Sequence, residues 1–441
     1  MSLFERMRDR ASAGRPVSVG VVGAGQMGRG LIVQMERLAH FHVAGVADLD
    51  LDRARSALSV AGVPDEQMVE VDDLWVAERA ADAGRRVLVR DPELLASLKT
   101  HEVVVDATGV PEVGARVAYA AIRVGKHVVM LNVEADVTVG RVLRRLAAAA
   151  GVVYTGSAGD EYAATKELVD FAGALGFDVV AAGKGKNNPL DRHATPDQLR
   201  ARAQAISANP AMLASFVDGT KTAVEMTCLA NATGLVPDIR GMHGPTVTVD
   251  SLTKTFCHRE DGGILDRIGV VDYAIGVAPG VFVVIDTDEP VIAANLRYLK
   301  LGQGPRWLLY RPYHLANLET PMSVARAAIY GEATIAPRTE PVAETIAIAK
   351  RDLKPGEQLD SIGGFSFYGL IELASTAHQE GILPLGLAEG ATVVAPVSMG
   401  EPIPRASVEI DQTTLLARLR AMQDAASDWP PAAATLTAFN R

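Results

Sequence analysis

Three glycines near the start of the chain, Gly23, Gly25 and Gly28, have the spacing of a turn that binds a dinucleotide. In such a turn the first glycine permits a tight bend, the second lets the backbone approach a pyrophosphate, and the third lets a helix pack on a strand. The pyrophosphate then lies at the positive end of that helix. We predict that this turn, including Gln26 and Met27, binds a dinucleotide; the alternative is an ordinary glycine turn.

Asp48 follows the glycine turn at the distance of about twenty residues that is typical of the acid binding the adenosine ribose. A carboxylate there repels a 2′-phosphate, so the cofactor is NAD or NADP with NAD favoured, although Arg53 and Arg55 are near enough in sequence to reach a phosphate. Further along, Thr108 and Gly109 follow an apolar run. We expect them at the nicotinamide end, unless they form only a strand-to-helix turn.

Hydride transfer to a carbonyl needs a proton donor or a cation near the oxygen, and Lys184 and Lys186, set among glycines, are candidates for that role. The alternative is that they are solvated surface lysines. Asn187 and Asn188 follow directly and extend the polar cluster. We therefore predict catalytic lysines with two asparagines that contact substrate.

Asp160 and Glu161 are adjacent carboxylates, which suit Mg²⁺ or Mn²⁺ through hard oxygen ligands or let one of them act as a base. Asp160 could instead cap a helix. Because successive residues rarely face the same way, we expect at most one of them to contact a metal directly.

Two loop histidines, His243 and His314, have the residue type for proton transfer, and Arg311 beside the second suits a phosphate or carboxylate on the substrate. A structural histidine is the alternative for each. Weaker candidates from the same region are Glu225, Asn231 and Asp238. No spacing supports a zinc site or a Ser-His-Asp arrangement.

Strands and helices alternate in the first third of the chain, which predicts an α/β fold with a parallel, doubly wound Rossmann sheet. The glycine turn joins a strand over 17–22 to a helix that carries Leu31, Ile32, Met35 and Leu38 at helical spacing. Other expected elements are strands over 41–47, 102–107, 127–132, 152–155 and 178–182 and helices over 113–124 and 162–175. The segment 65–99 has no clear assignment and is a candidate insertion over the cofactor site.

After residue 182 the alternation is lost, which predicts a central α+β domain that supplies substrate contacts. Residues 336–341 contain two prolines and are typical of a linker. From 342 to about 410 short apolar runs alternate with turns, which indicates a small β-rich module. A helix over 413–426 and a loose Pro- and Ala-rich tail follow.

Composition limits the classes of partner. The 441 residues carry a net charge of −10 without any block of Lys and Arg, which argues against nucleic acid. The two cysteines, Cys228 and Cys257, fit a reduced compartment and exclude a disulfide framework. The first residues lack the apolar core of a signal peptide, and no apolar stretch approaches about twenty residues. We expect a cytoplasmic protein with a small-molecule substrate and no membrane contact.

Longer runs resemble known families. Residues 125–130 with Asn132 and the four residues after it resemble the cofactor domain of homoserine-dehydrogenase-like oxidoreductases, which implies that Asn132 contacts the cofactor. Five further runs are similar to the DRL family, the 1-deoxy-D-xylulose 5-phosphate reductoisomerase-like enzymes: residues 158–161, 183–190, 231–238, 241–245 and 311–315. Residues 350–356, 363, 386–387 and 400–403 look like an SAF domain.

The resemblance implies a three-part enzyme that is usually a homodimer. Its parts are a Rossmann domain over 1–157, a catalytic and dimerisation domain over 158–335, and an SAF-like domain over 342–441. The family's named activity is rearrangement of deoxyxylulose phosphate followed by reduction with NADPH, aided by a divalent cation.

Two features depart from that pattern: Asp48 argues for NAD, and Tyr162-Ala163-Ala164 stands where proline and serines are expected. The leading hypothesis is an NAD(P)-dependent oxidoreductase on a small hydroxylated, phosphorylated or acidic sugar-like substrate, with isomerisation coupled to hydride transfer. The alternatives are a simple NAD-linked dehydrogenase of sugar-acid catabolism and a non-catalytic NAD sensor.

Overall fold

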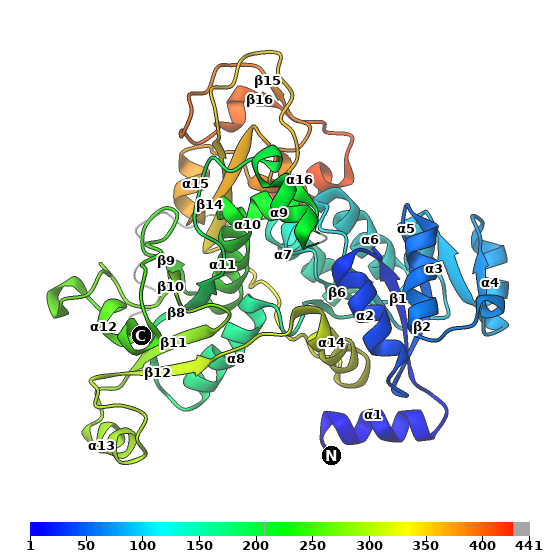
Figure 1. Ribbon diagram of the computed structural model, residues 1–441, viewed down its shortest axis with the longest axis horizontal. Coiled ribbons are helices and arrows are strands. Elements are labelled where there is room, and N and C mark those ends of the chain that lie inside the picture. Colours follow the sequence, from blue (N-terminus) through cyan, green and yellow to red (C-terminus); the bar gives the residue numbers. More distant parts are fainter. Residues whose placement is uncertain (207, 427–441) are drawn as a thin grey trace. The chain divides into compact units, whose positions relative to one another are not determined.

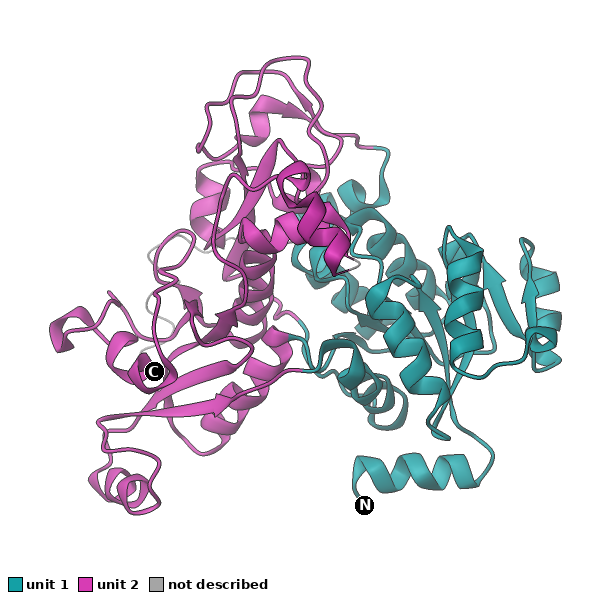
Figure 2. Ribbon diagram, in the orientation of Figure 1, with its two compact units in different colours: residues 1–160, 315–336, 413–425 teal, residues 161–314, 337–412, 426–441 magenta. Residues whose placement is uncertain are grey.

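The computed structural model describes residues 1–206 and 208–426 (Figure 1). It divides into two compact units, each assembled from several segments (Figure 2). Unit 1 comprises Met1–Asp160, Leu315–Ala336 and Thr413–Ala425, and unit 2 includes Glu161–His314 and Pro337–Gln412. The division into three domains remains a prediction, and the expected Pro- and Ala-rich tail lies outside the described residues.

Unit 1 is built on a seven-stranded sheet in the order β3-β4-β2-β1-β5-β6-β7, with every neighbouring pair parallel. The order reverses between β1 and β5, which is the topology of a doubly wound Rossmann sheet and confirms the predicted α/β class. Its strands are β1 (Val17–Val22), β2 (Phe41–Ala47), β3 (Met68–Glu70), β4 (Arg86–Val89), β5 (Val103–Asp106), β6 (His127–Met130) and β7 (Tyr154–Gly156).

The helices of unit 1 come from three parts of the sequence. Leu31, Ile32 and Met35 of α2 are fully buried against β1, as the helical spacing predicts. Gly30 lets α14 approach α2, because a Cβ there would lie 2.3 Å from Asn317 Nδ2. The helices are α1 (Leu3–Ser12), α2 (Gln26–Glu36), α3 (Leu51–Val60), α4 (Leu74–Asp82), α5 (Pro92–Ser97), α6 (Pro111–Arg123), α7 (Val133–Ala149), α14 (Ala316–Tyr330) and α16 (Leu415–Ala425).

The segment 65–99 is part of the sheet, so its interpretation as an insertion over the cofactor site is wrong. It forms β3, α4, β4 and α5, and β4 pairs with β2 through Val87, Leu88 and Val89. Strands of three and four residues are too short to show a hydrophobic period, and they are stabilised by pairing in the sheet, β4 with β2 and β3 with β4. The strand expected at 152–155 is also displaced, since β7 is Tyr154–Gly156.

Unit 2 is centred on a five-stranded mixed sheet in the order β12-β11-β8-β10-β9. The central strand β8 is parallel to β10 and antiparallel to β11, and α8 and α11 pack against these strands. The elements are α8 (Glu161–Ala174), β8 (Asp178–Lys186), α9 (Pro196–Ala205), α10 (Pro210–Val217), α11 (Thr220–Thr233), β9 (Val236–Pro237), α12 (Leu252–Thr255), β10 (Val270–Ile275), β11 (Val281–Asp286), α13 (Pro290–Tyr298) and β12 (Arg306–Arg311).

The C-terminal segment, residues 342–412, is rich in short β elements, as the turns in its sequence predict. It contains the hairpin pair β13 (Ala343–Ala349) and β14 (Phe367–Leu373), the helix α15 (Ala374–Gln379), and the pair β15 (Thr392–Val393) and β16 (Val408–Glu409). It belongs to unit 2, and α11 packs against β13 and β14.

A buried ion pair ties this C-terminal segment to the rest of unit 2. Lys350 Nζ donates to Asp218 Oδ2 at 2.9 Å and also to the carbonyl oxygens of Ala194 and Gly364 at 2.9 Å each. Because Lys350 is 4% exposed and Asp218 is fully buried, each charge is stable there only with its partner.

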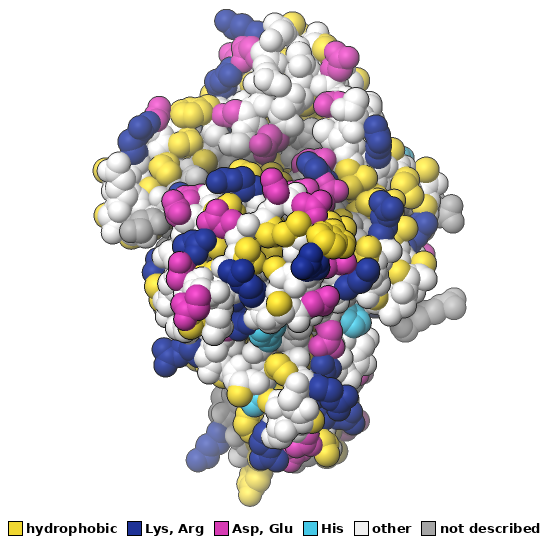
Figure 3. Space-filling view, turned by 90° about the vertical axis from the view of Figure 1, so that its right-hand side faces the viewer, with side chains coloured by type: hydrophobic (Ala, Val, Ile, Leu, Met, Phe, Trp, Pro, Cys, Tyr) yellow, Lys and Arg dark blue, Asp and Glu magenta, His cyan; other side chains and the backbone are white. Residues whose placement is uncertain are grey.

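Charges of both signs are mixed on one face of the protein. On the face drawn in Figure 3, Lys and Arg side chains are interspersed with Asp and Glu. Among the described residues, no helix combines the length and apolar character that a membrane crossing would require.

We expect Lys350→Met to lower the free energy of unfolding of the protein by about 3–5 kcal/mol, because the substitution leaves the Asp218 carboxylate buried without its cation. Urea denaturation followed by circular dichroism measures this loss. Lys354→Met, at an exposed position five residues from the β13 strand end, is the matched control and should change stability by less than about 0.5 kcal/mol. Equal effects of the two substitutions would contradict the prediction.

Candidate functional site

The predicted cofactor turn has the geometry that a dinucleotide requires. Gly23 has φ +93°, and a Cβ there would lie 3.0 Å from Ala107 O. Gly28 allows the close contact of helix and strand, since its Cβ would fall 1.8 Å from Gly23 O. Gly25 is the N-cap of α2 and has open space where a Cβ would stand. The turn therefore leaves room for a pyrophosphate at the positive end of α2.

Asp48 lies beside this turn at the end of β2. Its Oδ2 accepts a hydrogen bond of 2.7 Å from Ala24 N, and its Oδ1 accepts one of 2.8 Å from Asp50 N. Both arginines considered for a 2′-phosphate are already paired: Arg53 lies 3.1 Å from Asp50, and Arg55 binds Asp65 and Glu70. The carboxylate is thus placed at the edge where the adenosine ribose of a dinucleotide binds.

Arg90 is a residue near this edge that the sequence alone did not identify. It follows β4, and its Nη1 donates to Leu49 O at 2.5 Å, directly after Asp48. No signal in the sequence points to it, because the neighbourhood depends on β4 lying beside β2.

The predicted nicotinamide-end residues form one network in unit 1. Thr108 donates to Asp106 Oδ1 through its backbone N at 2.9 Å and its Oγ1 at 2.7 Å. Asn132, the N-cap of α7, donates to Asp106 Oδ2 and to Val110 O at 2.9 Å each. Burial raises the pKa of Asp106 to about 6, although these hydrogen bonds oppose the shift. The network holds the Thr108–Gly109 turn at the carboxyl end of β5; a cofactor role for these residues and Asn132 remains a prediction.

In unit 2, strand pairing aligns several predicted residues across one face of the sheet. Lys184 of β8 pairs with Tyr273 of β10 and with Val281 of β11, and Val281 pairs with Arg311 of β12. Residues paired in register point to the same side of a sheet. Lys184, Tyr273 and Arg311 therefore share the face on which α8 packs.

The strand β8 is longer than predicted, since it extends to Lys186 and the sequence predicts an end at residue 182. The alternation of glycine and lysine after residue 182 explains both the length of the strand and why its end was predicted too early. A Cβ on Gly183 would lie 1.9 Å from Asp272 O, and one on Gly185 would lie 2.2 Å from Ala278 N. The glycines therefore serve close backbone packing on one face, while Lys184 and Lys186 occupy the other. Both lysines lie inside the strand and are buried, which contradicts the solvated alternative.

Lys184 is held by two carboxylates. Its Nζ donates to Glu161 Oε1 at 2.8 Å and to Glu225 Oε2, and all three residues are at least nine-tenths buried. Burial alone would lower the pKa of Lys184, but the charges of Glu161 and Glu225 outweigh it and raise the pKa. Burial and the charge of Glu161 raise the pKa of Glu225. Lys184 is therefore a permanent cation.

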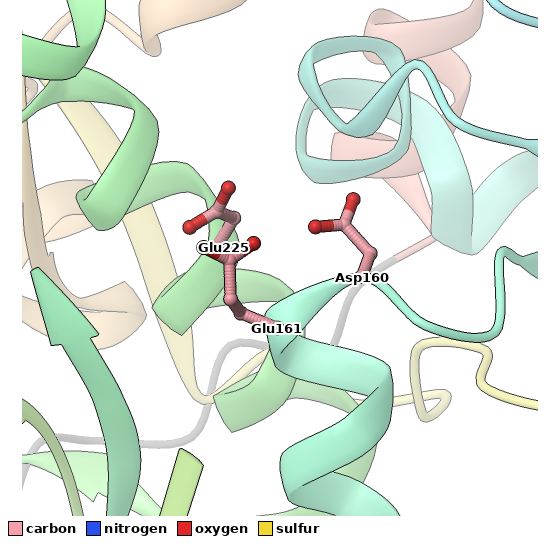
Figure 4. A group of neighbouring side chains, drawn as sticks. All are labelled: Asp160, Glu161 and Glu225. Atoms are coloured by element: carbon pink, nitrogen blue, oxygen red, sulfur yellow. The ribbon is translucent and has the colours of Figure 1, made fainter. Parts of the chain in front are cut away.

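The same carboxylates were the candidates for a divalent metal. Asp160, Glu161 and Glu225 offer oxygens within 4.8 Å of one another, and Figure 4 shows Glu161 at the start of α8 with Glu225 on a neighbouring helix. However, the Lys184 ammonium already binds both glutamates and supplies the cation between them. A metal at that position would have to displace the Lys184 ammonium, and a metal role for Asp160 and Glu161 remains a prediction.

Lys186 has a different environment on the same face. Its Nζ donates to Phe216 O at 2.5 Å, and the residue is 4% exposed. Burial and the positive charge of Lys184 lower the pKa of Lys186 to about 8. Lys186 can therefore gain or lose a proton near neutral pH.

Of the other predicted residues of unit 2, His314 lies at the Lys184 cluster, whereas Arg311 and the two asparagines have other neighbours. His314 Nε2 lies 3.4 Å from Glu161 Oε1, which brings it to the Lys184 cluster. Arg311 Nη1 lies 3.2 Å from Glu167 Oε2 on α8. Asn187 is exposed just after β8, and Asn188 accepts a hydrogen bond from Arg202.

His243 belongs to a separate cluster. Its Nε2 lies 2.8 Å from Asp238 Oδ2, and Asp238 Oδ1 lies 3.3 Å from Arg267 Nε. Its backbone N donates to Asp272, whose pKa burial raises to about 6. Within the described residues, no hydrogen bond or ion pair joins His243 to Lys184 or Lys186.

Two family models match the chain. Residues 23–155 match the NAD-binding domain of homoserine dehydrogenase, and residues 159–320 match the catalytic domain of oxidoreductase DRL. With the glycine turn and the doubly wound sheet, these matches define an NAD(P)-dependent oxidoreductase. The match over residues 159–320 confirms that this region resembles the DRL family, as seen in the sequence. No curated protein sequence matches the chain.

The solved structures that match this chain are only distantly similar to it. A probable dehydrogenase from Thermotoga maritima is 13% identical, with 72% of this chain and 90% of that chain covered and a TM-score of 0.42. Scyllo-inositol dehydrogenase from Lactobacillus casei, with bound NAD(H) and scyllo-inositol, is 13% identical, with 67% of this chain and 76% of that chain covered and a TM-score of 0.38. A DOX-P reductoisomerase with fosmidomycin and magnesium is 14% identical, with 48% of this chain and 56% of that chain covered and a TM-score of 0.34. Likenesses of this size say nothing about the activity of this chain.

We expect Gly25→Ala to weaken NAD⁺ binding at least about tenfold, because the added methyl group enters the space a pyrophosphate occupies. Folding should be preserved, since nothing lies within 4 Å of that Cβ. Isothermal titration calorimetry measures the affinity, and thermal denaturation checks the fold. Gly173→Ala in α8, which also has open space around its Cβ, is the matched control and should bind as the wild type. Unchanged binding by Gly25→Ala would refute a dinucleotide on this turn.

Proposed function

We propose that this protein uses NAD to oxidise or reduce a small hydroxylated, phosphorylated or acidic sugar-like substrate, with Lys186 as the general acid and base. The observation that carries the proposal is the pair of lysines on β8. Lys184 is fixed as a cation by Glu161 and Glu225, whereas Lys186 has a pKa of about 8. Two neighbouring groups whose environments separate their pKa values are typical of an electrostatic and a proton-transfer role.

The chemistry assigned to each group follows from its environment. In the oxidation direction, neutral Lys186 takes the proton of the substrate hydroxyl while a hydride leaves the same carbon for the nicotinamide; reduction reverses both transfers. Lys184 stabilises negative charge on the substrate oxygen and never releases its proton. His314 lies at this cluster, with its Nε2 3.4 Å from Glu161 Oε1. NAD is the proposed cofactor because Asp48 opposes a 2′-phosphate.

Coupling of a skeletal rearrangement to the hydride transfer is a second candidate, and the match of residues 159–320 to the DRL catalytic domain favours it. The carboxylate cluster carries its own cation in Lys184, so we route no step of either reaction through a metal.

The first experiment titrates the purified protein with NAD⁺, NADH, NADP⁺ and NADPH and then follows absorbance at 340 nm with deoxyxylulose phosphate and with sugar acids, in EDTA. We expect tighter binding of NAD⁺ than of NADP⁺ and turnover that survives EDTA. Product analysis separates simple oxidation from rearrangement. Tight binding of NADPH would overturn the proposed preference for NAD. Turnover only with added Mn²⁺ would overturn the proposal that the reaction needs no metal. No turnover with any hydroxylated acid would favour an NAD sensor.

The pH profile of kcat tests the role of Lys186. Oxidation needs the neutral amine, so its kcat should rise with pH and level off above about 8, while kcat for reduction should fall through the same range. Lys186→Arg keeps a cation that cannot titrate there and should lower kcat roughly 10²- to 10⁴-fold with loss of the inflection. An inflection that persists in this variant would assign the proton transfer to another group.

A further inference from the structure

A second set of polar groups in unit 2 surrounds Arg192, a residue that no motif of the sequence singles out. Arg192 Nη1 donates to Asp218 O at 3.0 Å, and Lys186 Nζ donates to Phe216 O at 2.5 Å. Both cations therefore reach the same short turn at the end of α10. The charge of Arg192 acts on Lys186, and it opposes the burial that raises the pKa of Tyr273 and of Tyr368.

The C-terminal segment contributes to this cluster. Tyr368 lies on β14, and the Arg192 guanidinium carbon lies 5.4 Å from the centroid of its ring. Tyr273 lies on β10, in register with Lys184. The two tyrosines are 8% and 4% exposed, respectively, and this small exposure includes their hydroxyls.

The cluster has more hydrogen-bond donors than acceptors. Within residues 1–206 and 208–426, the guanidinium of Arg192 makes one hydrogen bond, and the Lys186 ammonium makes one. In the same residues the hydroxyls of Tyr273 and Tyr368 have no hydrogen-bond partner. Within the described residues none of these unpaired donors is sealed away from water, so they are available to a ligand that accepts hydrogen bonds.

The nearby carboxylates do not fill this role. Asp218 accepts from Lys350, and Glu225 accepts from Lys184. Asp272 is adjacent to Tyr273 in β10 and accepts from the backbone N of His243 and of Gly244, and Gly244 also lies against the Tyr273 phenol. Within the described residues no hydrogen bond joins the Asp272 carboxylate to that phenol. A purely structural role, in which two cations cap the C-terminus of α10, accounts for Lys186 and Arg192 but not for the two phenols.

We propose that Arg192, Tyr273 and Tyr368 bind the anionic end of the substrate, a phosphate or a carboxylate, next to Lys186. The inference rests on the proposed function in that it assigns the acidic group of the same substrate. A planar guanidinium with two phenols suits an oxyanion, since each donor meets a separate oxygen lone pair. The C-terminal segment thereby acquires a role in substrate binding, because its Tyr368 completes the site.

Lys350 acts as a positioning residue in this arrangement. Its ion pair with Asp218 holds β13 of the C-terminal segment against the turn whose carbonyl oxygen binds Arg192. The buried pair therefore helps to fix the contact between Arg192 and the Tyr368 ring.

Binding of small anions tests the proposal without turnover. Calorimetric titration with inorganic phosphate and with acetate, at constant ionic strength set by chloride, should show binding of at least one of them to the wild type. Arg192→Met should weaken that binding roughly 10- to 100-fold, and Tyr368→Phe should weaken it about three- to tenfold, as expected for losing a charged and a neutral donor. Tighter phosphate binding assigns a phosphorylated substrate, and acetate binding alone assigns a carboxylate.

Controls separate this inference from the proposed function. Arg200→Met, on exposed α9, removes an arginine that pairs only with Asp197 and should bind anions as the wild type. With a turned-over substrate, Arg192→Met should raise KM far more than it lowers kcat, and Arg192→Lys should restore part of the affinity. Anion binding that depends on Arg192 in a protein without turnover supports the site and contradicts the activity. Wild-type anion affinity in both Arg192→Met and Tyr368→Phe overturns the site whatever the activity.

Discussion

The packing of α8, β8 and α11 in unit 2 depends on the ion pairs that Lys184 makes with Glu161 and Glu225. All three side chains are nearly excluded from water, and a charge in such a place is stable only with a partner. The three residues come from α8, β8 and α11, so the ion pairs also fix how these elements pack. Because Lys184 must remain charged, its field acts on every group near it, including Lys186.

The difference between the two lysines shows how one strand supplies two chemical roles. They are two residues apart and share a face, yet only Lys184 has carboxylate partners within hydrogen-bond distance. The charge of Lys184 then lowers the pKa of Lys186, which adds to the effect of burial. Gly183 and Gly185 make this possible, since they let the neighbouring backbones approach on the opposite face and keep the lysines on the covered one.

Within unit 2, the C-terminal segment is joined to the other elements through interior contacts. Lys350 reaches Asp218 with both charges buried, Asn231 binds the backbone of Ala343, and Thr345 donates to Thr227. Interior polar contacts of this kind require fixed partners on both sides. The segment is therefore part of the packed interior of unit 2, and its Tyr368 lies against Arg192.

The sequence by itself determined the parts whose physics is local. The glycine turn, the apolar strand before it and Asp48 after β2 are set by residue type and short-range spacing, and they predicted the Rossmann unit and its cofactor edge. Lys184, Lys186, Asp160 and Glu161 were also identified as chemical candidates from type and resemblance. Tertiary structure alone decided how they act. The pairing of Lys184 with Glu225, the place of β4 beside β2, and the meeting of Arg192 with Tyr368 join residues far apart in sequence. Charges and pKa values depend on such contacts, because burial and partners, rather than residue type, set the free energy of the charged form.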